Sequence, residues 1–82
     1  MAVKRMISVE KPVAIVAAGL DEAVRVAHDI HGWHYLDAAE ELPSYAPAAA
    51  SGWLVRGRRV AFLCADRAGW YIFEYVAGPV DG

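Results

Sequence analysis

The sequence predicts a small α+β protein in which a mainly antiparallel sheet of four or five strands packs on one principal helix. The last third of the chain, residues 53–76, holds three runs of β-branched and aromatic residues that are separated by turn sequences. Residues 20–31 instead repeat apolar side chains at the spacing of a helix. The chain has 82 residues and no internal repeat, so residues 1–82 are expected to form one small domain.

Two apolar runs near the N-terminus, 6–9 and 13–17, are expected to be strands. The second run is rich in alanine and could instead open a helix, with Pro12 in its first turn. A strand is favoured because Gly19 then becomes the N-cap of the following helix, and two acidic residues occupy the positive first turn of that helix.

The principal helix is expected at about 20–31 and ends before Gly32, which is a common C-terminal stop. A sequence Asp-Ala-Ala-Glu then matches the spacing of a capping box. It predicts a short second helix at about 38–42, which Pro43 would end. Residues 44–52 are rich in Ala, Pro and Ser and are expected to be a connector.

The C-terminal runs 53–56, 59–65 and 70–76 are expected to form a three-stranded antiparallel meander. In the first turn, Gly57 is at the first central position of a two-residue loop, which suits a type II′ hairpin and places Trp53 opposite Phe62.

The second turn has Asp66 at its first position and Gly69 at its fourth. This pattern predicts a type I turn followed by a left-handed glycine, which makes a three-residue loop with a bulge. Asp66 would then lie opposite Trp70, and Phe62 opposite Glu74. A loop of different parity would exchange the two faces of the third strand.

Alternation along the strands sorts these residues onto two faces. The expected core face holds Trp53, Val55, Val60, Phe62, Cys64, Trp70, Ile72, Glu74 and Val76. The second face holds Leu54, Arg56, Arg59, Ala61, Leu63, Ala65, Tyr71, Phe73 and Tyr75. The core is expected to join Trp53, Phe62, Trp70 and Ile72 to Leu20, Val24 and Ala27 of the helix.

The second face is apolar, and one helix about 10 Å across cannot cover both faces of a sheet about 20 Å wide. It is therefore expected to bind a protein partner or a second copy of the chain. The residues expected to bind are Arg56, Arg58, Arg59, Tyr71, Phe73 and Tyr75. The alternative is that the N-terminal segment or the loop at Tyr45 folds over this face.

Single-stranded nucleic acid is a second possible ligand, because aromatic rings beside arginines can stack bases and neutralise phosphates. The net charge of −2 and the acidic residues of the predicted helix region oppose binding of a polyanion. A protein partner is therefore preferred.

Chemistry-bearing motifs are sparse. His28, His31 and His34 recur every third residue and are the candidate metal ligands, but the stop at Gly32 separates them, so no metal or other cofactor is expected. Cys64 is expected to be a buried thiol with a raised pKa rather than a nucleophile. No catalytic motif is present, and the protein is expected not to be an enzyme.

Composition indicates the class of protein. A single cysteine suits a reducing compartment, and no apolar run approaches the roughly 20 residues that span a bilayer, so a cytoplasmic protein without membrane contact is expected. The 57% apolar content is high for so short a chain, which favours burial against a partner, most simply in a homodimer. Size and lack of motifs are typical of small bacterial or phage inhibitors and regulators of larger complexes, such as antitoxins, immunity proteins and anti-CRISPR proteins.

Overall fold

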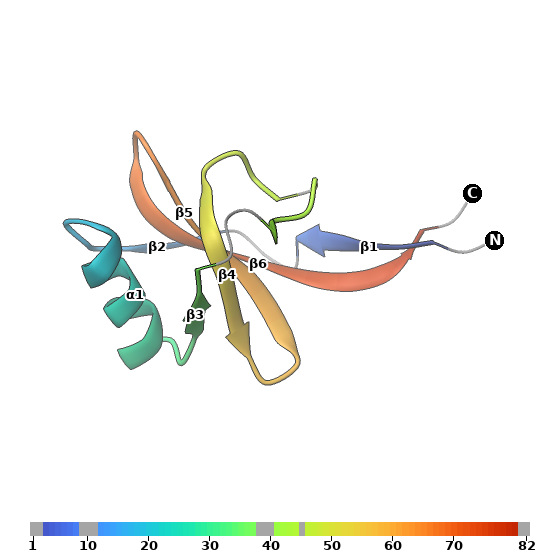
Figure 1. The fold of residues 1–82 in the computed structure, drawn as a ribbon, viewed down its shortest axis with the longest axis horizontal. Helices are drawn as coiled ribbons and strands as arrows, with labels where there is room; N and C mark the ends of the chain where they lie inside the picture. The colour runs from blue at the N-terminus through green and yellow to red at the C-terminus, as the bar shows by residue number, and fades with distance from the viewer. Residues whose placement is uncertain (1–2, 9–11, 38–40, 45, 81–82) are drawn as a thin grey trace.

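The computed structural model describes residues 3–8, 12–37, 41–44 and 46–80 and has an α+β fold with an antiparallel sheet (Figure 1). The elements are β1 (Val3–Ser8), β2 (Val13–Ile15), α1 (Leu20–Asp29), β3 (His34–Leu36), β4 (Ala50–Arg56), β5 (Arg59–Asp66) and β6 (Gly69–Val80). The short helix expected at 38–42 falls mainly on residues 38–40, which lie outside the described residues.

Within the described ranges, six strands form one sheet in the order β1-β6-β5-β4-β3, and β2 also pairs with β6. Every pair is antiparallel. The two N-terminal strands lie along the same edge of β6, β2 beside residues 70–72 and β1 beside residues 75–80. Residues 13–15 of the run at 13–17 are therefore a strand, as expected, and α1 begins at Leu20.

The first C-terminal hairpin has the predicted register. Trp53 is opposite Phe62, and Arg56 is opposite Arg59. Gly57 has φ +62, a conformation that a two-residue turn requires and that L side chains rarely adopt.

The register predicted for the second hairpin is wrong by one residue. Asp66 is opposite Gly69 rather than Trp70, and Phe62 is opposite Phe73. The loop is shorter than expected because the backbone N–H of Ala68 donates to Asp66 Oδ1 at 2.8 Å and closes a two-residue turn. A one-residue slip moves every side chain of β6 to the other face, so the two faces of this strand are exchanged.

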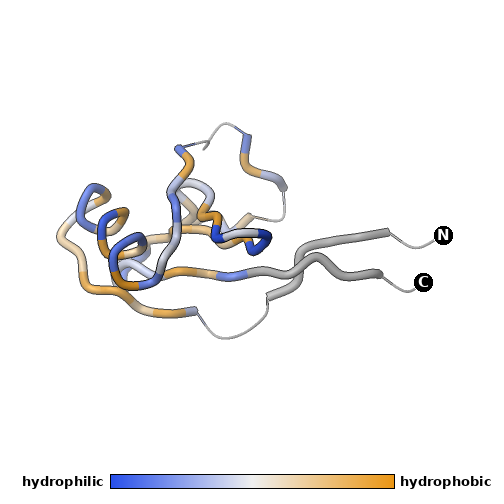
Figure 2. The backbone as a smooth tube through the Cα atoms, turned by 90° about the horizontal axis from the view of Figure 1, so that it is seen from below, coloured by the Kyte–Doolittle hydropathy of each residue, from blue (hydrophilic) through white to orange (hydrophobic). Residues whose placement is uncertain are grey.

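Helix α1, in which hydrophilic and hydrophobic residues alternate along the coil (Figure 2), packs on the face of the sheet that carries Leu54, Ala61, Leu63 and Ile72. We call it the helix face; its core cluster comprises Ile15, Ala23, Ala27, Trp33, Leu54, Ala61, Leu63 and Ile72. Two alanines of α1 in this cluster have no exposed surface, which lets the helix backbone lie close to the sheet.

The predicted position of the helix is wrong for β4 and β5, since α1 packs on the face of Leu54 and Leu63 rather than on that of Phe62. The predicted core set is therefore split between the two faces. Phe62 and Ile72 are buried as expected, at 0% and 3% exposure, but the exchanged register puts them on opposite sides of the sheet. Trp53 and Trp70 are only half-buried, and Leu20 is 39% exposed.

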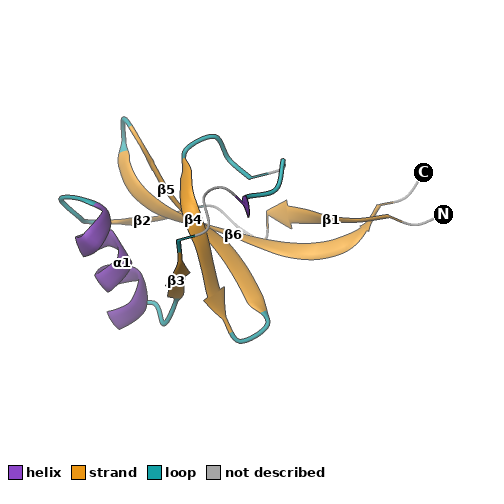
Figure 3. Ribbon diagram, in the orientation of Figure 1, coloured by secondary structure: helices purple, strands orange, loops and turns teal. Residues whose placement is uncertain are grey.

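The face opposite the helix, which we call the open face, is covered at its centre by the chain itself. Phe62 and Cys64 have no exposed surface, and the ring of Trp53 lies 4.6 Å from that of Phe62. The connection between β3 and β4 passes on the side of β4 away from α1 (Figure 3), and its last residue, Ala49, accepts a hydrogen bond from the Ala65 N–H at 3.1 Å. On β4 and β5 this open face is the one that was expected to lie under the helix. The opposite face, with Leu54 and Leu63, was expected to need a partner, the N-terminal segment or the loop at Tyr45 to cover it, but α1 covers it. Tyr45 itself lies outside the described residues.

Strand β1 and the C-terminal half of β6 form a two-stranded ribbon that projects from the body (Figure 1). Six residue pairs join the two strands, from Val3 with Val80 to Ser8 with Tyr75. At about 3.4 Å per residue the ribbon is about 20 Å long, close to half of the 44 Å long dimension of the molecule. The ribbon thus extends well beyond the sheet area that α1 covers.

Candidate binding surfaces

Arg56, one of the predicted binding residues, is engaged within the protein. Its Nη1 donates to the carbonyl oxygen of His31 at 2.6 Å, and its guanidinium carbon lies 4.3 Å from the centre of the Trp33 ring. The backbone N–H of Trp33 donates to the carbonyl oxygen of Ala27 at 2.9 Å. These contacts hold the connection between α1 and β3 against the end of β4, so Arg56 has a structural role.

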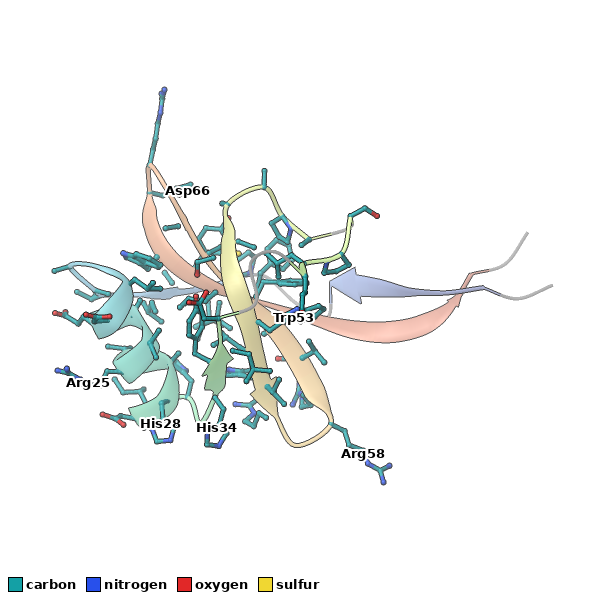
Figure 4. The ribbon with its side chains drawn as sticks, in the orientation of Figure 1. Arg25, His28, His34, Trp53, Arg58 and Asp66 are labelled. Atoms are coloured by element: carbon teal, nitrogen blue, oxygen red, sulfur yellow. The ribbon has the colours of Figure 1, made fainter. Side chains whose placement is uncertain are left out.

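The other two predicted arginines differ in environment. Arg59 forms an ion pair with Glu74, whose side chain is buried on the helix face. Such a pair offsets the cost of burying a carboxylate. Arg58 is exposed at the tip of the hairpin between β4 and β5 and points away from the body (Figure 4).

The aromatic half of the predicted site lies on the other side of the sheet. Tyr71 and Phe73 are on the open face, where their ring centres are 6.3 Å apart at an angle of 54°. Tyr75 pairs through its backbone with β1 and β5, and its side chain is outside what the structure describes. The exchanged register therefore separates the rings of Tyr71 and Phe73 from Arg56 and Arg59, so the mixed surface expected from the sequence is not assembled.

The two rings border a hollow of about 320 Å³ between β2, β6 and the turn before β6. Its lining residues are Pro12, Ala14, Asp66, Ala68, Gly69, Trp70, Tyr71 and Phe73. Asp66 is the one charged residue in this lining, as far as the structure describes the chain. The sequence pattern pointed to the rings but missed the hollow, because that depends on β2 pairing beside β6 and on the short turn.

Cys64 faces the same side as Tyr71 and is fully buried, as expected. The pKa of its thiol is raised from an ordinary value of 9.0 to about 11. Burial is the main cause; a hydrogen bond with Tyr71 lowers the pKa, and the negative charge of Asp66 raises it. At neutral pH the thiol is protonated and behaves as a small apolar side chain.

This shift predicts that the protein loses stability between pH 9 and pH 11. The unfolded thiol ionises near pH 9.0, whereas the folded thiol ionises near pH 11. The unfolded state therefore binds fewer protons in this window, and the free energy of unfolding falls by on the order of 2 kcal/mol as the pH rises. Urea denaturation of wild type and Cys64→Ala at each pH isolates the effect of the thiol, because other groups titrate in both proteins. Parallel pH profiles would contradict the assignment.

The structure brings together two of the three histidines. The rings of His28 and His34 are 5.1 Å apart at the exposed end of α1 (Figure 4), and His28 Nδ1 lies 2.9 Å from Asp29 Oδ1. His31 contributes a backbone carbonyl oxygen to Arg56. Within the described ranges, no group of three or more His, Cys, Asp or Glu side chains could hold a metal ion.

The outer edge of β1 is a second surface that the sequence analysis did not identify. Strand β1 pairs with β6 on one side, and no described strand pairs with its other side. Beyond Tyr75, where pairing with β5 ends, the other edge of β6 likewise has no partner strand among the described residues. Open edges of this kind expose unpaired backbone N–H and C=O groups.

The fold and these surfaces define a small α+β protein with a projecting β-ribbon and an aromatic hollow on the open face. Comparisons with known proteins find no counterpart, since no protein-family model, no curated protein and no solved structure matches the chain. In the described part of the chain, no helix is both long enough and apolar enough to cross a membrane. The functional assignment therefore rests on the geometry of this chain.

Proposed function

We propose that the protein is a non-catalytic protein-binding module that forms a homodimer by pairing β1 with β1 of a second copy. The observation that supports this most strongly is the projecting ribbon, because no described strand pairs with the outer edge of any of the six residues of β1. A two-stranded ribbon is at best marginally stable in water by itself, whereas additional strands stabilise it. Pairing β1 with its copy places each ribbon inside a four-stranded sheet.

The edge of β1 is a better partner than the open edge of β6. The free part of β6 contains Pro79, which has no N–H to donate to a neighbouring strand. Strand β1, with the sequence Val-Lys-Arg-Met-Ile-Ser, contains no proline and is half apolar. Two-fold pairing of the same edge also gives a closed dimer rather than an open fibre.

Symmetry and charge select one register for this dimer. When two antiparallel strands are related by a two-fold axis, one residue lies opposite its own copy. The two registers with the longest overlap, five residue pairs within Val3–Ser8, place either Arg5 or Met6 on the axis. Arg5 on the axis would place two guanidinium groups opposite each other, which is unfavourable. With Met6 on the axis, Arg5 is opposite position 7 and Lys4 is opposite position 8 of the second copy. No like charges are then directly opposed.

This register predicts that Met6→Cys forms a covalent dimer under mild oxidation. Directly opposed residues have Cα atoms about 4.5–5.5 Å apart, within the range of a disulfide. Ser8→Cys is the matched control, because positions 8 of the two copies would be about 13 Å apart along the strands, too far for a disulfide. Non-reducing gel electrophoresis measures both, and the buried native Cys64 is expected to leave wild type monomeric on the gel.

Equal cross-linking of Met6→Cys and Ser8→Cys would indicate random collision and would contradict the register. The absence of any cross-link at Met6 under the same oxidant would contradict pairing of β1 with its copy. The amide spectrum of each reduced variant confirms that the fold is intact, so neither result can be attributed to unfolding.

The geometry gives single-stranded nucleic acid less support. Arg56 and Arg59 make internal contacts on the helix face, while Tyr71 and Phe73 lie on the open face beside the carboxylate of Asp66. A negative group beside the rings repels phosphates. We propose that the dimer acts as a small inhibitor or regulator of a larger complex. Pairing through β1 leaves the hollow on the open face accessible to a further partner.

A further inference from the structure

We infer that the hollow on the open face binds the guanidinium group of an arginine side chain that a partner protein presents. None of the described lining residues belongs to β1. The inference is therefore independent of the proposed dimer, and each can fail without the other.

Two aromatic rings supply the first part of the recognition. Tyr71 and Phe73 are adjacent on the same face of β6, and their 54° tilt makes a corner rather than a flat stack. A planar cation that enters such a corner can lie over one ring and against the edge of the other. Guanidinium groups stack on aromatic faces in this way because they are planar and weakly hydrated.

Asp66 supplies the second part. Among the described residues it is the one charged residue that lines the hollow, and it is held in place because its Oδ1 accepts the backbone N–H of Ala68 at 2.8 Å. The carboxylate is thus oriented before any ligand binds, which lowers the entropy lost on binding. A carboxylate beside aromatic rings favours a cation over an anion or a neutral side chain, and the fork of a guanidinium matches its geometry.

The size of the hollow supports a side chain rather than a cofactor. Its volume of about 320 Å³ is at the lower end of the roughly 300–1,000 Å³ that ligand pockets occupy. Pro12 and Ala14 also line the hollow. Their apolar surfaces can contact the methylene groups of an arginine while its charged end meets Asp66.

Nα-acetyl-L-arginine amide is the probe, and the citrulline analogue is the matched control ligand, since it replaces the guanidinium with a neutral urea group of similar shape. Amide chemical shifts of Ala68, Gly69 and Tyr71 report on the hollow during titration. We expect saturable shifts with a Kd in the roughly millimolar range for a single side chain. The citrulline analogue is expected to give no saturable shift.

Two variants separate the contributions of charge and ring. Asp66→Asn keeps an oxygen that can accept the Ala68 N–H but removes the charge, and it is expected to weaken binding about tenfold or more. Phe73→Leu keeps apolar volume but removes a ring, and it is expected to weaken binding as well. The spectrum of each free variant shows whether the fold is preserved.

The inference is overturned if the arginine and citrulline probes shift the amides equally, if neither gives saturable shifts, or if Asp66→Asn binds the arginine probe as wild type does. If Phe73→Leu alone leaves binding unchanged, the aromatic part of the inference is wrong. Saturable binding of the arginine probe that is lost in both variants supports the site.

Discussion

Replacing Phe62 with alanine is expected to lower the free energy of unfolding by about 3–5 kcal/mol. The side chain is fully buried at the centre of the open face, against the ring of Trp53. Truncation removes the buried ring and leaves a cavity, because the sheet backbone on both sides of β5 cannot collapse into it. A domain of 82 residues has only about 4–12 kcal/mol of stability in total, so the variant should unfold at a much lower urea concentration.

Val16→Ala is the control for this truncation. Val16 is also apolar, but 89% of its surface is exposed, so its loss should change stability by less than about 0.5 kcal/mol. Far-UV circular dichroism during urea denaturation measures both variants. If Phe62→Ala unfolds at the same urea concentration as Val16→Ala, the open face is not packed at its centre as described.

Trp33→Ala is expected to have a comparable effect on the opposite side of the sheet, again about 3–5 kcal/mol. Trp33 is 3% exposed in the core cluster beneath α1, and its ring carries the guanidinium of Arg56. Its removal therefore opens a cavity and also leaves Arg56 without its aromatic contact. The connection between α1 and β3 then loses one of its contacts with the end of β4.

Trp33→Phe and Arg56→Met resolve these two contributions. Phenylalanine keeps an aromatic ring for the guanidinium, so its cost should be smaller than that of alanine. Arg56→Met keeps an apolar stem but loses the cation and the hydrogen bond to His31, at a cost of about 1–3 kcal/mol. Urea denaturation of the three variants gives the order, and a Trp33→Ala protein as stable as wild type would contradict the packing of the helix face.

The sequence predicted correctly those elements that depend on residues close together in the chain, which are α1 and the first hairpin. The periodicity of residues 20–31 predicted α1, although the helix ends at Asp29, two residues early. Gly57 predicted the register of the first hairpin correctly. The second turn was assigned one residue too long, because a pattern with Asp66 first and Gly69 fourth suits both loop lengths. The hydrogen bond from Ala68 to Asp66 decides between them in the structure.

The one-residue difference in the length of the second turn also decided which side chains lie together in the candidate site. The sequence identified Tyr71 and Phe73 as surface rings near the sheet, but their partners depend on the parity of the turn. Trp33 was missing from the expected core, because it lies in a connection with no periodic pattern, and Arg56 was assigned to binding because its contact with Trp33 is between residues far apart in the sequence. The open edge of β1 depends on pairing between the two ends of the chain, which no local pattern reveals.

Sedimentation equilibrium of the wild-type protein tests most directly whether β1 pairs with its copy in a dimer. The expected mass is twice the 8.9 kDa of one chain at high protein concentration, and it should decrease toward one chain on dilution. Association should strengthen at higher salt, because Lys4 and Arg5 of both copies are brought near each other and screening reduces their repulsion. A mass of one chain at every concentration and salt would contradict the account.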